Sequence, residues 1–383
     1  MPRIWLSAGE TSGDRLGAGL ARALLARRPD LELVGMGGRE MAEAGVRLLQ
    51  DSHEVSVTGL LEVVRHLPAI RRIKKRLVAE LERQPPDLLV PIDFPDFNLR
   101  IAADAGRLGI PVVYYVSPQV WAWRRGRLRR IRELVRRMLV LFPFETGFYE
   151  RAGVPVTFVG NPVALRGGTD RSAAELLAGA GLEGEGSVVA LVPGSRVGEV
   201  RRMLPVMLDA ARLLQQVRPG LRFLLTVAPG LDRDKLESTV DRSGLDRVAL
   251  HEGDFPEVLS PCAAGLVTAG TASLEAAMVG LPMVVVYRMN PLSYLLGRLL
   301  VRVENVALPN LVAGRRIVPE LIQGGCRPHA VAAELARFLD DPVRAARVRR
   351  ELSELRTKLA GEGAYERAAE AVLAELAAGR SAD

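Results

Sequence analysis

Short apolar runs and amphipathic segments alternate along the first 160 residues of the chain. Strands are predicted for six runs, at Arg3–Ser7, Leu33–Met36, Asp87–Ile92, Val112–Val116, Met138–Leu141 and Thr157–Val159. Helices are predicted between them, at Arg15–Arg27, Arg39–Ala44, Leu60–Arg83, Leu99–Leu108, Arg124–Arg137 and Phe144–Ala152. Strands separated by helices of this length indicate a parallel sheet with right-handed crossovers.

A second alternation of the same kind follows a stretch rich in glycine and polar residues, Pro162–Ser172, which we interpret as a linker. Strands are predicted at Val188–Val192, Arg222–Val227, Val248–His251, Gly265–Thr268, Met283–Val286 and Asn305–Ala307. Helices are predicted at Glu199–Val217, Asp234–Ser243, Pro256–Leu259, Ser273–Val279, His329–Phe338 and through a charged region, Pro342–Ala378. The pattern predicts an α/β protein with two Rossmann-like halves, and ligands are favoured where two such halves face each other.

The composition supports two folded domains. The chain has 383 residues, and a domain commonly takes about 100–200 residues. A hydrophobic content of 48% excludes a disordered protein. The first ten residues contain no apolar signal-peptide core, and no run reaches the ~18 apolar residues of a membrane span, so we expect a soluble or peripheral cytoplasmic protein. Two cysteines, Cys262 and Cys326, form no metal or disulfide framework.

Positive charge is concentrated in two segments. The net charge is +7, with eight arginines in Arg124–Arg137 and six lysines or arginines in Arg65–Arg76. Such patches attract phosphates, whether of nucleic acid, anionic lipid or nucleotide, and charge alone does not choose among them. Trp121 and Trp123 precede the first patch. These tryptophans suit stacking on single-stranded nucleic acid, a wall of a sugar or lipid site, or ordinary packing.

The segment IDFPDFN, Ile92–Asn98, follows an apolar run that predicts a buried strand. In open α/β sheets, ligands bind at the carboxyl ends of the strands. The paired carboxylates of Asp93 and Asp96 are therefore placed to supply a general base. The alternative is turn chemistry, since aspartate before proline is a common turn former and Asn98 can cap the next helix.

The first loop, SAGETSGD at Ser7–Asp14, also follows a predicted strand. Its glycines lie four apart and no Gly-Lys-Ser/Thr follows, so it is neither a dinucleotide fingerprint nor a P-loop. Glu10 and Asp14 would repel a phosphate, which favours a hydroxyl-bearing ligand. A helix start capped by Thr11 or Ser12 is the alternative.

The second half carries phosphate-binding candidates. LVPGSR, Leu191–Arg196, follows a predicted strand, and its backbone N–H groups with the Arg196 guanidinium suit a phosphate. Gly270 and Thr271 open a helix whose N-terminus can hold a diphosphate. Glu275 is the only charge between Glu257 and Arg288, so it needs a partner or a ligand, and ribose hydroxyls would suit it.

An amphipathic stripe runs through the first basic segment, with apolar residues at Val57, Leu60, Leu61, Val64 and Leu67 and basic residues at Arg65, Arg71, Arg72, Lys74, Lys75 and Arg76. An apolar face with basic flanks is typical of an interfacial membrane anchor. The alternative is an ordinary helix that covers a sheet. Pro68 is expected to kink or split this helix.

Seven motifs in this order and spacing resemble the lipid-A-disaccharide synthases, a family of GT-B glycosyltransferases. They are AGETSGD, IDFPDFN, YYVSPQVWAWR, PGSRVGEV, the GTASLE helix, PMVVVYR and LPNLVAGR, and together they span nearly the whole chain. The resemblance implies two Rossmann-like domains with parallel sheets facing across a cleft. The implied division is 1–165 for the acceptor and membrane-docking domain, 166–345 for UDP-sugar binding, and 346–383 for a helical region returning to the N-terminal domain.

The resemblance implies an inverting transfer of 2,3-diacylglucosamine from UDP to the 6-hydroxyl of 2,3-diacylglucosamine 1-phosphate. The products would be the β-1,6 lipid A disaccharide and UDP, and neither cofactor nor metal is expected. The partners implied are these two lipid substrates and the cytoplasmic face of the inner membrane, without nucleic acid. The alternatives are another UDP-sugar GT-B enzyme, such as a UDP-GlcNAc 2-epimerase or a different glycolipid transferase, and a nucleic-acid-binding protein.

The resemblance also implies roles for individual residues. The predicted base is Asp96. The predicted donor site comprises Ser195, Arg196, Gly270, Thr271, Glu275, Tyr287 and Asn310. The predicted acceptor site comprises Glu10, Ser12, Asp14, Asp93, Asn98, Gln119 and Trp123. The predicted membrane-docking residues are Val57, Leu60, Leu61, Val64, Arg71, Arg72, Lys74, Lys75 and Met203. Asn161 and Leu165 depart from the family, which usually has a histidine and an acidic residue there.

Overall fold

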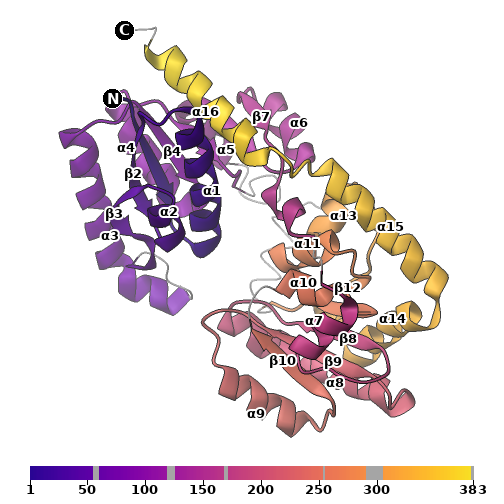
Figure 1. Ribbon diagram of the computed structural model, residues 1–383. Coiled ribbons are helices and arrows are strands. Elements are labelled where there is room, and N and C mark those ends of the chain that lie inside the picture. Colours follow the sequence, from indigo (N-terminus) through magenta and orange to yellow (C-terminus); the bar gives the residue numbers. More distant parts are fainter. Residues whose placement is uncertain (55–59, 119–125, 168–170, 253–254, 290–304, 381–383) are drawn as a thin grey trace. The chain divides into compact units, whose positions relative to one another are not determined.

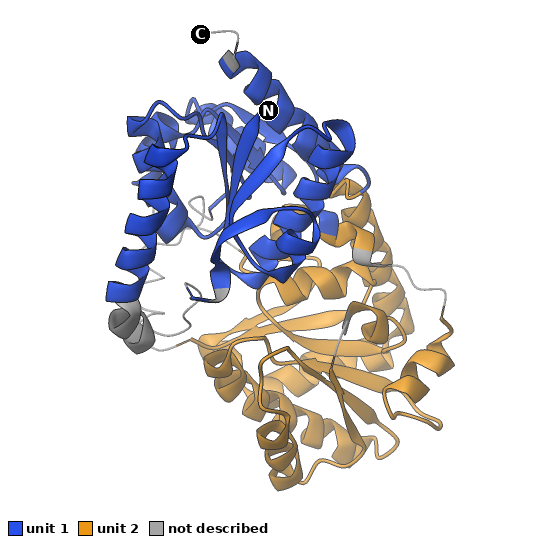
Figure 2. Cartoon of the chain, turned by 60° about the vertical axis from the view of Figure 1, so that its left-hand side comes forward, with its two compact units in different colours: residues 1–162, 362–383 blue, residues 163–361 orange. Residues whose placement is uncertain are grey.

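Two parallel β-sheets, each with helices on its faces, organise the chain (Figure 1). The computed structural model describes residues 1–54, 60–118, 126–167, 171–252, 255–289 and 305–380. It divides into two units, of which unit 1 comprises Met1–Pro162 with Glu362–Asp383 and unit 2 comprises Val163–Gly361 (Figure 2).

Unit 1 contains a seven-stranded sheet in the order β3-β2-β1-β4-β5-β6-β7. Its strands are β1 Arg3–Ala8, β2 Glu32–Gly37, β3 Arg47–Asp51, β4 Leu88–Ile92, β5 Val113–Tyr115, β6 Arg137–Val140 and β7 Val156–Phe158. Its helices are α1 Thr11–Arg27, α2 Arg39–Glu43, α3 Leu60–Arg83, α4 Pro95–Arg107, α5 Arg127–Leu134, α6 Pro143–Arg151 and α16 Ala364–Arg380, with the 3-10 turn η1 at Ser52–Glu54. The order reverses between the adjacent strands β1 and β4, which makes their carboxyl ends the favoured ligand edge.

The apolar residues of β1 alternate between two cores, as expected for a strand buried on both faces. Ile4 and Leu6 belong to one core, which also contains buried residues of α1 and α16. Trp5 belongs to the other core, with residues of α3, α4 and α5. The sheet is therefore covered by helices on both faces, and only its edges and strand ends remain for polar chemistry.

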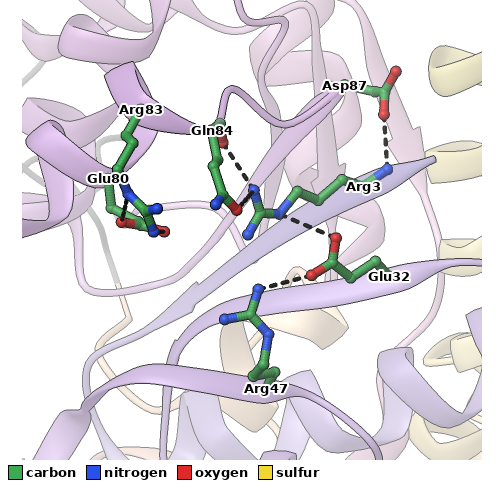
Figure 3. Close-up of polar contacts among 7 residues, drawn as sticks. All are labelled: Arg3, Glu32, Arg47, Glu80, Arg83, Gln84 and Asp87. Atoms are coloured by element: carbon green, nitrogen blue, oxygen red, sulfur yellow. Dashed lines mark hydrogen bonds and ion pairs between the residues drawn. The ribbon is translucent and has the colours of Figure 1, made fainter. Parts of the chain in front are cut away.

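The amino ends of β1, β2 and β3 and the segment before β4 are joined by a polar network (Figure 3). The Arg3 backbone N–H donates to the Asp87 carboxylate at 2.7 Å, and its guanidinium donates to the Gln84 side-chain oxygen at 2.7 Å. Glu32 accepts from Arg47 at 2.7 Å and lies 3.4 Å from the Arg3 guanidinium. These contacts tie β1 to β2, β3 and the α3–β4 loop, at the end of the sheet opposite the predicted ligand edge.

Unit 2 contains a six-stranded sheet in the order β10-β9-β8-β11-β12-β13, all parallel. Its strands are β8 Val188–Val192, β9 Arg222–Val227, β10 Val248–Glu252, β11 Ala264–Thr268, β12 Met283–Tyr287 and β13 Glu320–Ile322. Its helices are α7 Ala173–Gly179, α8 Val197–Val217, α9 Arg233–Ser243, α10 Phe255–Leu259, α11 Thr271–Met278, α13 Leu308–Ala313, α14 Pro328–Asp340 and α15 Pro342–Lys358, and the 3-10 turns are η2 Pro162–Gly167 and η3 Gln323–Gly325. Here the order reverses between β8 and β11.

Several sequence-based assignments differ from the structure. The half-exposed edge strand β3 was missed, because its charged ends interrupt any apolar run. Asn305–Ala307 forms no strand, since the backbone N–H groups of Val306 and Ala307 donate to the Glu320 carboxylate at 2.9 and 3.1 Å. α3 continues through Pro68 as one helix. The helix predicted at Arg124–Arg137 ends at Leu134, because Arg137 begins β6.

The C-terminal region, predicted as one body at 346–383, is divided between the units. α15 belongs to unit 2, where it packs against α11, α13 and α14. α16 belongs to unit 1 and packs along α1, where Figure 1 shows it beside that helix. Its Ala368, Ala369 and Val372 are fully buried in the core. The return to the N-terminal sheet is therefore made by α16 alone.

Candidate functional site

The β4–α4 loop of unit 1 has an unusual backbone. Asp93 and Phe94 both adopt left-handed conformations, with φ of 46° and 48°. Residues other than glycine rarely adopt these angles, which cost on the order of 1 kcal/mol or more each. The surroundings hold them in place: the Asp93 backbone N–H donates to the Tyr115 carbonyl at 3.0 Å, and the Tyr114 hydroxyl donates to the Asp93 carbonyl at 2.7 Å.

Gly9 makes room for this loop. A Cβ atom at Gly9 would lie 2.2 Å from the Phe94 ring, so any larger residue would displace the ring. The first glycine of the SAGETSGD loop thus serves close packing between the β1–α1 and β4–α4 loops. This packing brings the β1–α1 and β4–α4 loops into contact. The sequence predicted each loop after a strand but not the contact between them.

Asn98 holds the β4–α4 loop through side-chain hydrogen bonds and is fully buried. Its amide nitrogen donates to the carbonyls of Ser7 and Asp93, both at 2.9 Å, and lies 3.2 Å from that of Ile92. Its oxygen accepts from the Ser7 hydroxyl at 2.8 Å. These bonds occupy the side chain, which corrects its assignment to the acceptor site: Asn98 joins the ends of β1 and β4.

Asp96 lies in the first turn of α4, and its side chain is 70% exposed. A carboxylate is stabilised at this position by the positive end of the helix macrodipole. The Arg127 guanidinium, at the start of α5, forms an ion pair with it. Asp93 is partly buried beside it. The predicted base is therefore exposed to solvent at the ligand edge, on a backbone that its neighbours hold in place.

The other acceptor-site predictions separate into three groups. Asp14 is 4% exposed, and its carboxylate accepts from the backbone N–H groups of Gly38 at 2.6 Å, Glu40 at 3.0 Å and Met41 at 3.2 Å. Asp14 therefore caps α2, which corrects its assignment to ligand binding. Ser12 is exposed and Glu10 partly exposed at the start of α1. Gln119 and Trp123 lie outside the described residues.

Sequence reasoning missed two side chains of this site. Tyr114 holds the Asp93 carbonyl, and burial, followed by the charge of Asp93, raises its pKa well above the ordinary value, so it remains a hydrogen-bond donor. In the sequence, the only indication of Tyr114 was the aromatic pair Tyr114-Tyr115 at the end of a predicted strand. Arg127 was hidden among the eight arginines of its segment, where nothing in the sequence distinguished it from its neighbours.

In unit 2, the corresponding sheet edge carries the donor-site predictions. Ser195 and Arg196 are exposed between β8 and α8. Gly270 has a φ of 140° and is exposed between β11 and α11, with Thr271 exposed at the first position of that helix. The N–H groups at such helix starts suit an anion.

Two side chains flank these unit 2 loops. The Thr268 hydroxyl, at the end of β11, is buried and has no hydrogen-bond partner among the described residues. Glu275 is partly buried one turn into α11. Both lie beside the helix start that the sequence assigned to a diphosphate.

Tyr287 and Asn310, the last two donor-site predictions, differ in their surroundings. The Tyr287 hydroxyl lies 3.4 Å from the Glu199 carboxylate, and burial, followed by the charge of Glu199, raises its pKa. Asn310 is fully buried. Its amide nitrogen donates to the Val318 carbonyl at 2.9 Å and to Glu320 at 2.7 Å, and its oxygen accepts from two backbone N–H groups.

All hydrogen-bonding capacity of the Asn310 amide is thus used within unit 2. The structure corrects its assignment to the donor site: Asn310 holds the segment that joins α13 to β13.

The membrane-docking predictions also need correction. Met203 is fully buried in unit 2, where it lies 3.1 Å from the Arg288 backbone nitrogen, so it is no docking residue. Lys74 lies 2.6 Å from the buried Asp104 carboxylate, and burial, followed by the charge of Arg107, lowers its pKa. Arg71, Arg72 and Lys75 are exposed on α3. Val57 and the side chains of Leu60, Leu61 and Val64 lie outside the described residues.

No helix within the described ranges has both the length and the apolar character needed to cross a membrane. In the same part of the chain, no three His, Cys, Asp or Glu side chains gather as a metal site would require. Of the two family departures, Asn161 is buried and Leu165 is 48% exposed.

Comparison with solved structures identifies the fold. A glycotransferase of kitacinnamycin aligns with a TM-score of 0.64 at 18% identity, covering 97% of this chain and 98% of that chain. The calicheamicin glycosyltransferase aligns with a TM-score of 0.61 at 17% identity over all of both chains. These are GT-B glycosyltransferases, and the two parallel sheets of the present chain have the same fold.

Comparison of sequences is more specific. A family model described as lipid-A-disaccharide synthetase matches residues 4–375. The lipid-A-disaccharide synthase of Myxococcus xanthus is 46% identical over 379 residues, which are 99% of each chain. That of Geobacter sulfurreducens is 45% identical over 374 residues, which are 98% of this chain and 97% of the relative. On this agreement over nearly its whole length, the chain belongs to the lipid-A-disaccharide synthase family.

Proposed function

We propose that this chain transfers 2,3-diacylglucosamine from UDP to the 6-hydroxyl of 2,3-diacylglucosamine 1-phosphate, forming the β-1,6 disaccharide and UDP. Its family makes it a glycosyltransferase of lipid A biosynthesis. The observation that carries the proposed chemistry is Asp96, an exposed carboxylate at the strand ends where the sheet order reverses. Its loop is fixed by Asn98 and Tyr114, as a catalytic base requires.

The proposed reaction is a single displacement. The Asp96 carboxylate takes the proton of the acceptor 6-hydroxyl as that oxygen attacks the anomeric carbon of the donor. The bond from this carbon to the β-phosphate oxygen breaks, and UDP leaves from the opposite face. One attack from one side inverts the anomeric configuration, so no covalent sugar–enzyme intermediate forms. General-base catalysis of this kind is worth roughly 10²–10⁴-fold in rate.

Unit 2 supplies groups that suit the leaving UDP. The exposed Arg196 guanidinium and the helix starts at Val197 and Thr271 offer positive charge and backbone N–H groups for the diphosphate. Ser195 and the protonated Tyr287 hydroxyl add donors, and Gly270 keeps the loop open. Glu275 is the proposed partner of the ribose hydroxyls.

Unit 1 supplies groups that suit the acceptor and the membrane. Glu10, Ser12 and Asp93 are proposed to bind acceptor hydroxyls beside Asp96, with Gln119 and Trp123 completing the site. Because both substrates carry acyl chains, the protein must reach them at a lipid surface. We assign this contact to α3, with its exposed Arg71, Arg72 and Lys75 and the apolar Val57, Leu60, Leu61 and Val64, at the cytoplasmic face of the inner membrane.

The test is a transfer assay with mass spectrometric detection. The protein is incubated with UDP-2,3-diacylglucosamine and 2,3-diacylglucosamine 1-phosphate in detergent micelles, and the expected product is the disaccharide 1-phosphate with equimolar UDP. Parallel incubations replace the donor with UDP-GlcNAc. Epimerised UDP-GlcNAc together with no disaccharide would overturn the proposal in favour of a 2-epimerase.

A further inference from the structure

The ion pair between Asp96 and Arg127 occupies one oxygen of the carboxylate that the proposed reaction uses. The Asp96 Oδ1 atom accepts from the Arg127 guanidinium in this structure. A carboxylate that takes a proton from a hydroxyl must first offer that hydroxyl an oxygen within hydrogen-bond reach. An acceptor hydroxyl that approaches Oδ1 therefore competes with Arg127 for that oxygen.

Arg127 is itself placed unfavourably once this pair is broken. It is the first residue of α5, where the helix macrodipole is positive and a cation is destabilised. Its side chain is only 23% exposed, so water solvates the guanidinium incompletely. Separation of the pair without a substitute anion would leave a partly buried cation at the positive end of a helix.

The acceptor carries such an anion. In the proposed reaction, 2,3-diacylglucosamine 1-phosphate presents a hydroxyl to Asp96 and a phosphate dianion on the same sugar ring. A guanidinium matches a phosphate with two parallel N–H···O bonds, and such charge-assisted bonds are among the strongest in proteins. A phosphate therefore satisfies Arg127 better than the exposed carboxylate that it leaves.

We propose that Arg127 determines specificity for the phosphorylated acceptor by exchanging the Asp96 carboxylate for the 1-phosphate of the substrate. This inference rests on the proposed function and adds a role for a residue outside its predicted site. Binding of the correct acceptor would in this way remove Arg127 from Oδ1 of Asp96 at the moment when the acceptor hydroxyl arrives. An acceptor without the phosphate would meet a base that is still paired.

The neighbouring arginines of α5 do not share this position. Arg129 is 89% exposed and pairs with Glu133 on its own helix at 3.0 Å. Arg130 donates to the Leu99 carbonyl at 3.3 Å. Among the arginines of this helix that the structure describes, Arg127 is the one in contact with Asp96. Arg129 therefore offers a matched control, with the same charge on the same helix.

The kinetic test compares two acceptors, 2,3-diacylglucosamine with and without the 1-phosphate. For the wild-type protein we expect the phosphorylated acceptor to have the higher kcat/KM. In Arg127→Met this preference should fall about 10-fold or more, chiefly through the KM of the phosphorylated acceptor. Arg127→Lys should keep part of it, and Arg129→Met all of it. Equal losses for both acceptors, or an unchanged preference, would overturn the proposal.

The binding test needs no turnover. Asp96→Asn removes the competing carboxylate, so it should tighten binding of the phosphorylated acceptor about 2- to 5-fold, the range expected for an exposed ion pair. Binding of the acceptor without phosphate should not tighten, and the gain should vanish in Asp96→Asn/Arg127→Met. Calorimetry in micelles measures the wild-type protein and both variants with each of the two acceptors. An equal gain for both acceptors would contradict an exchange with the phosphate.

These two tests separate this proposal from the proposed function. If the wild-type protein joins no sugar to either acceptor, the proposed reaction fails, whereas the binding comparison still shows whether Arg127 recognises a phosphate in competition with Asp96. A second outcome is that transfer occurs while neither the kinetic preference nor the binding preference for the phosphorylated acceptor changes in the Arg127 variants. In that case the proposed reaction stands and the specificity role of Arg127 is wrong. Circular dichroism of each variant confirms that it is folded.

Discussion

The two sheets have the same strand order up to the edge strand β7, yet their corresponding loops differ in charge. β1 and β4 of unit 1 correspond to β8 and β11 of unit 2, since each pair flanks the reversal of strand order. In unit 1 these strands lead to Glu10, Asp93 and Asp96. In unit 2 they lead to Arg196 and the Gly270–Thr271 turn. We propose that one edge geometry serves hydroxyl chemistry in unit 1 and phosphate binding in unit 2.

The backbones of the two loops differ for a related reason. The β4–α4 loop places two non-glycine residues in left-handed conformations and holds them through Asn98. The β11–α11 loop reaches a positive φ at Gly270, where a Cβ atom would meet nothing within 4 Å. A base must be held at one position, whereas a diphosphate needs exposed N–H groups on an open turn. The fixed β4–α4 loop suits the proposed base, and the open β11–α11 loop suits the proposed diphosphate site.

The largest effect expected from this comparison is that of Asp96→Asn. The amide cannot accept the proton, so kcat should fall about 10²–10⁴-fold, while UDP affinity, which we assign to unit 2, stays within about twofold. Transfer assays and calorimetry with UDP measure the two quantities. Glu133→Gln, another exposed acid paired with an arginine of α5, is the control and should leave kcat unchanged. Near-normal turnover by Asp96→Asn would show that Asp96 is not the catalytic base.

The second prediction compares the two buried amides. Asn98→Ala and Asn310→Ala each leave several buried polar groups without partners, so each should lower the free energy of unfolding by about 2–4 kcal/mol. Only Asn98→Ala should also lower kcat when it is measured at temperatures well below the melting temperature. The reason is that Asn98 holds the loop that carries the proposed base. Denaturant titration and steady-state kinetics test both.

The same pair of variants tests the correction to the donor site. If folded Asn310→Ala loses UDP affinity more than about tenfold, Asn310 contacts the nucleotide after all, and the structural role assigned to it is wrong. An unchanged kcat in Asn98→Ala would show that the base does not depend on its clamp.

A smaller effect is expected from Arg196→Ala. Loss of one charge-assisted contact to a phosphate should weaken UDP binding by about 1.5–3 kcal/mol, without a change in unfolding free energy, since the side chain is exposed. Calorimetry measures the affinity, and Arg201→Ala, an exposed arginine of the adjoining helix α8, serves as the control. Equal behaviour of the two variants would contradict a specific phosphate contact in the β8–α8 loop.

The smallest effect concerns the stability of the two units. Both cysteines lie in unit 2, fully or almost fully buried, and burial raises the pKa of Cys262 to about 12. Thiol reagents at pH 8 should therefore leave the native protein unmodified and label it as unit 2 opens. All three tryptophans lie within residues 1–162, so their fluorescence follows unit 1. Coincident transitions of the two signals in guanidinium would show that the units unfold together.

The sequence was a good guide to the parts of the fold set by apolar pattern. Arg3–Ser7 was predicted within one residue of β1, because Ile4, Trp5 and Leu6 form a buried run. Arg47–Asp51 was missed because an edge strand buries little. Asn305–Ala307 was wrong because a distant carboxylate, Glu320, takes the backbone donors that a strand would have used.

The sequence also located polar residues at strand ends but not their partners. Asp14, Asn98 and Asn310 all have the residue type and position of ligand-binding groups, and in the structure all three bind backbone atoms instead. A buried amide or carboxylate is satisfied equally well by a ligand or by N–H and C=O groups, so residue type alone does not separate the two. The family motifs bring both kinds of residue together in one segment.

The placement of α16 has a consequence for synthesis of the protein on the ribosome. Unit 1 is interrupted by the whole of unit 2, and its last helix supplies Ala368, Ala369, Val372 and Leu376 to the core beside α1. A nascent chain therefore emerges with the apolar side of α1 uncovered, and this side stays uncovered until residues 364–380 have left the ribosome. During that interval the incomplete domain is a natural client for chaperones that shield exposed hydrophobic surface, and truncation after residue 361 would make that exposure permanent.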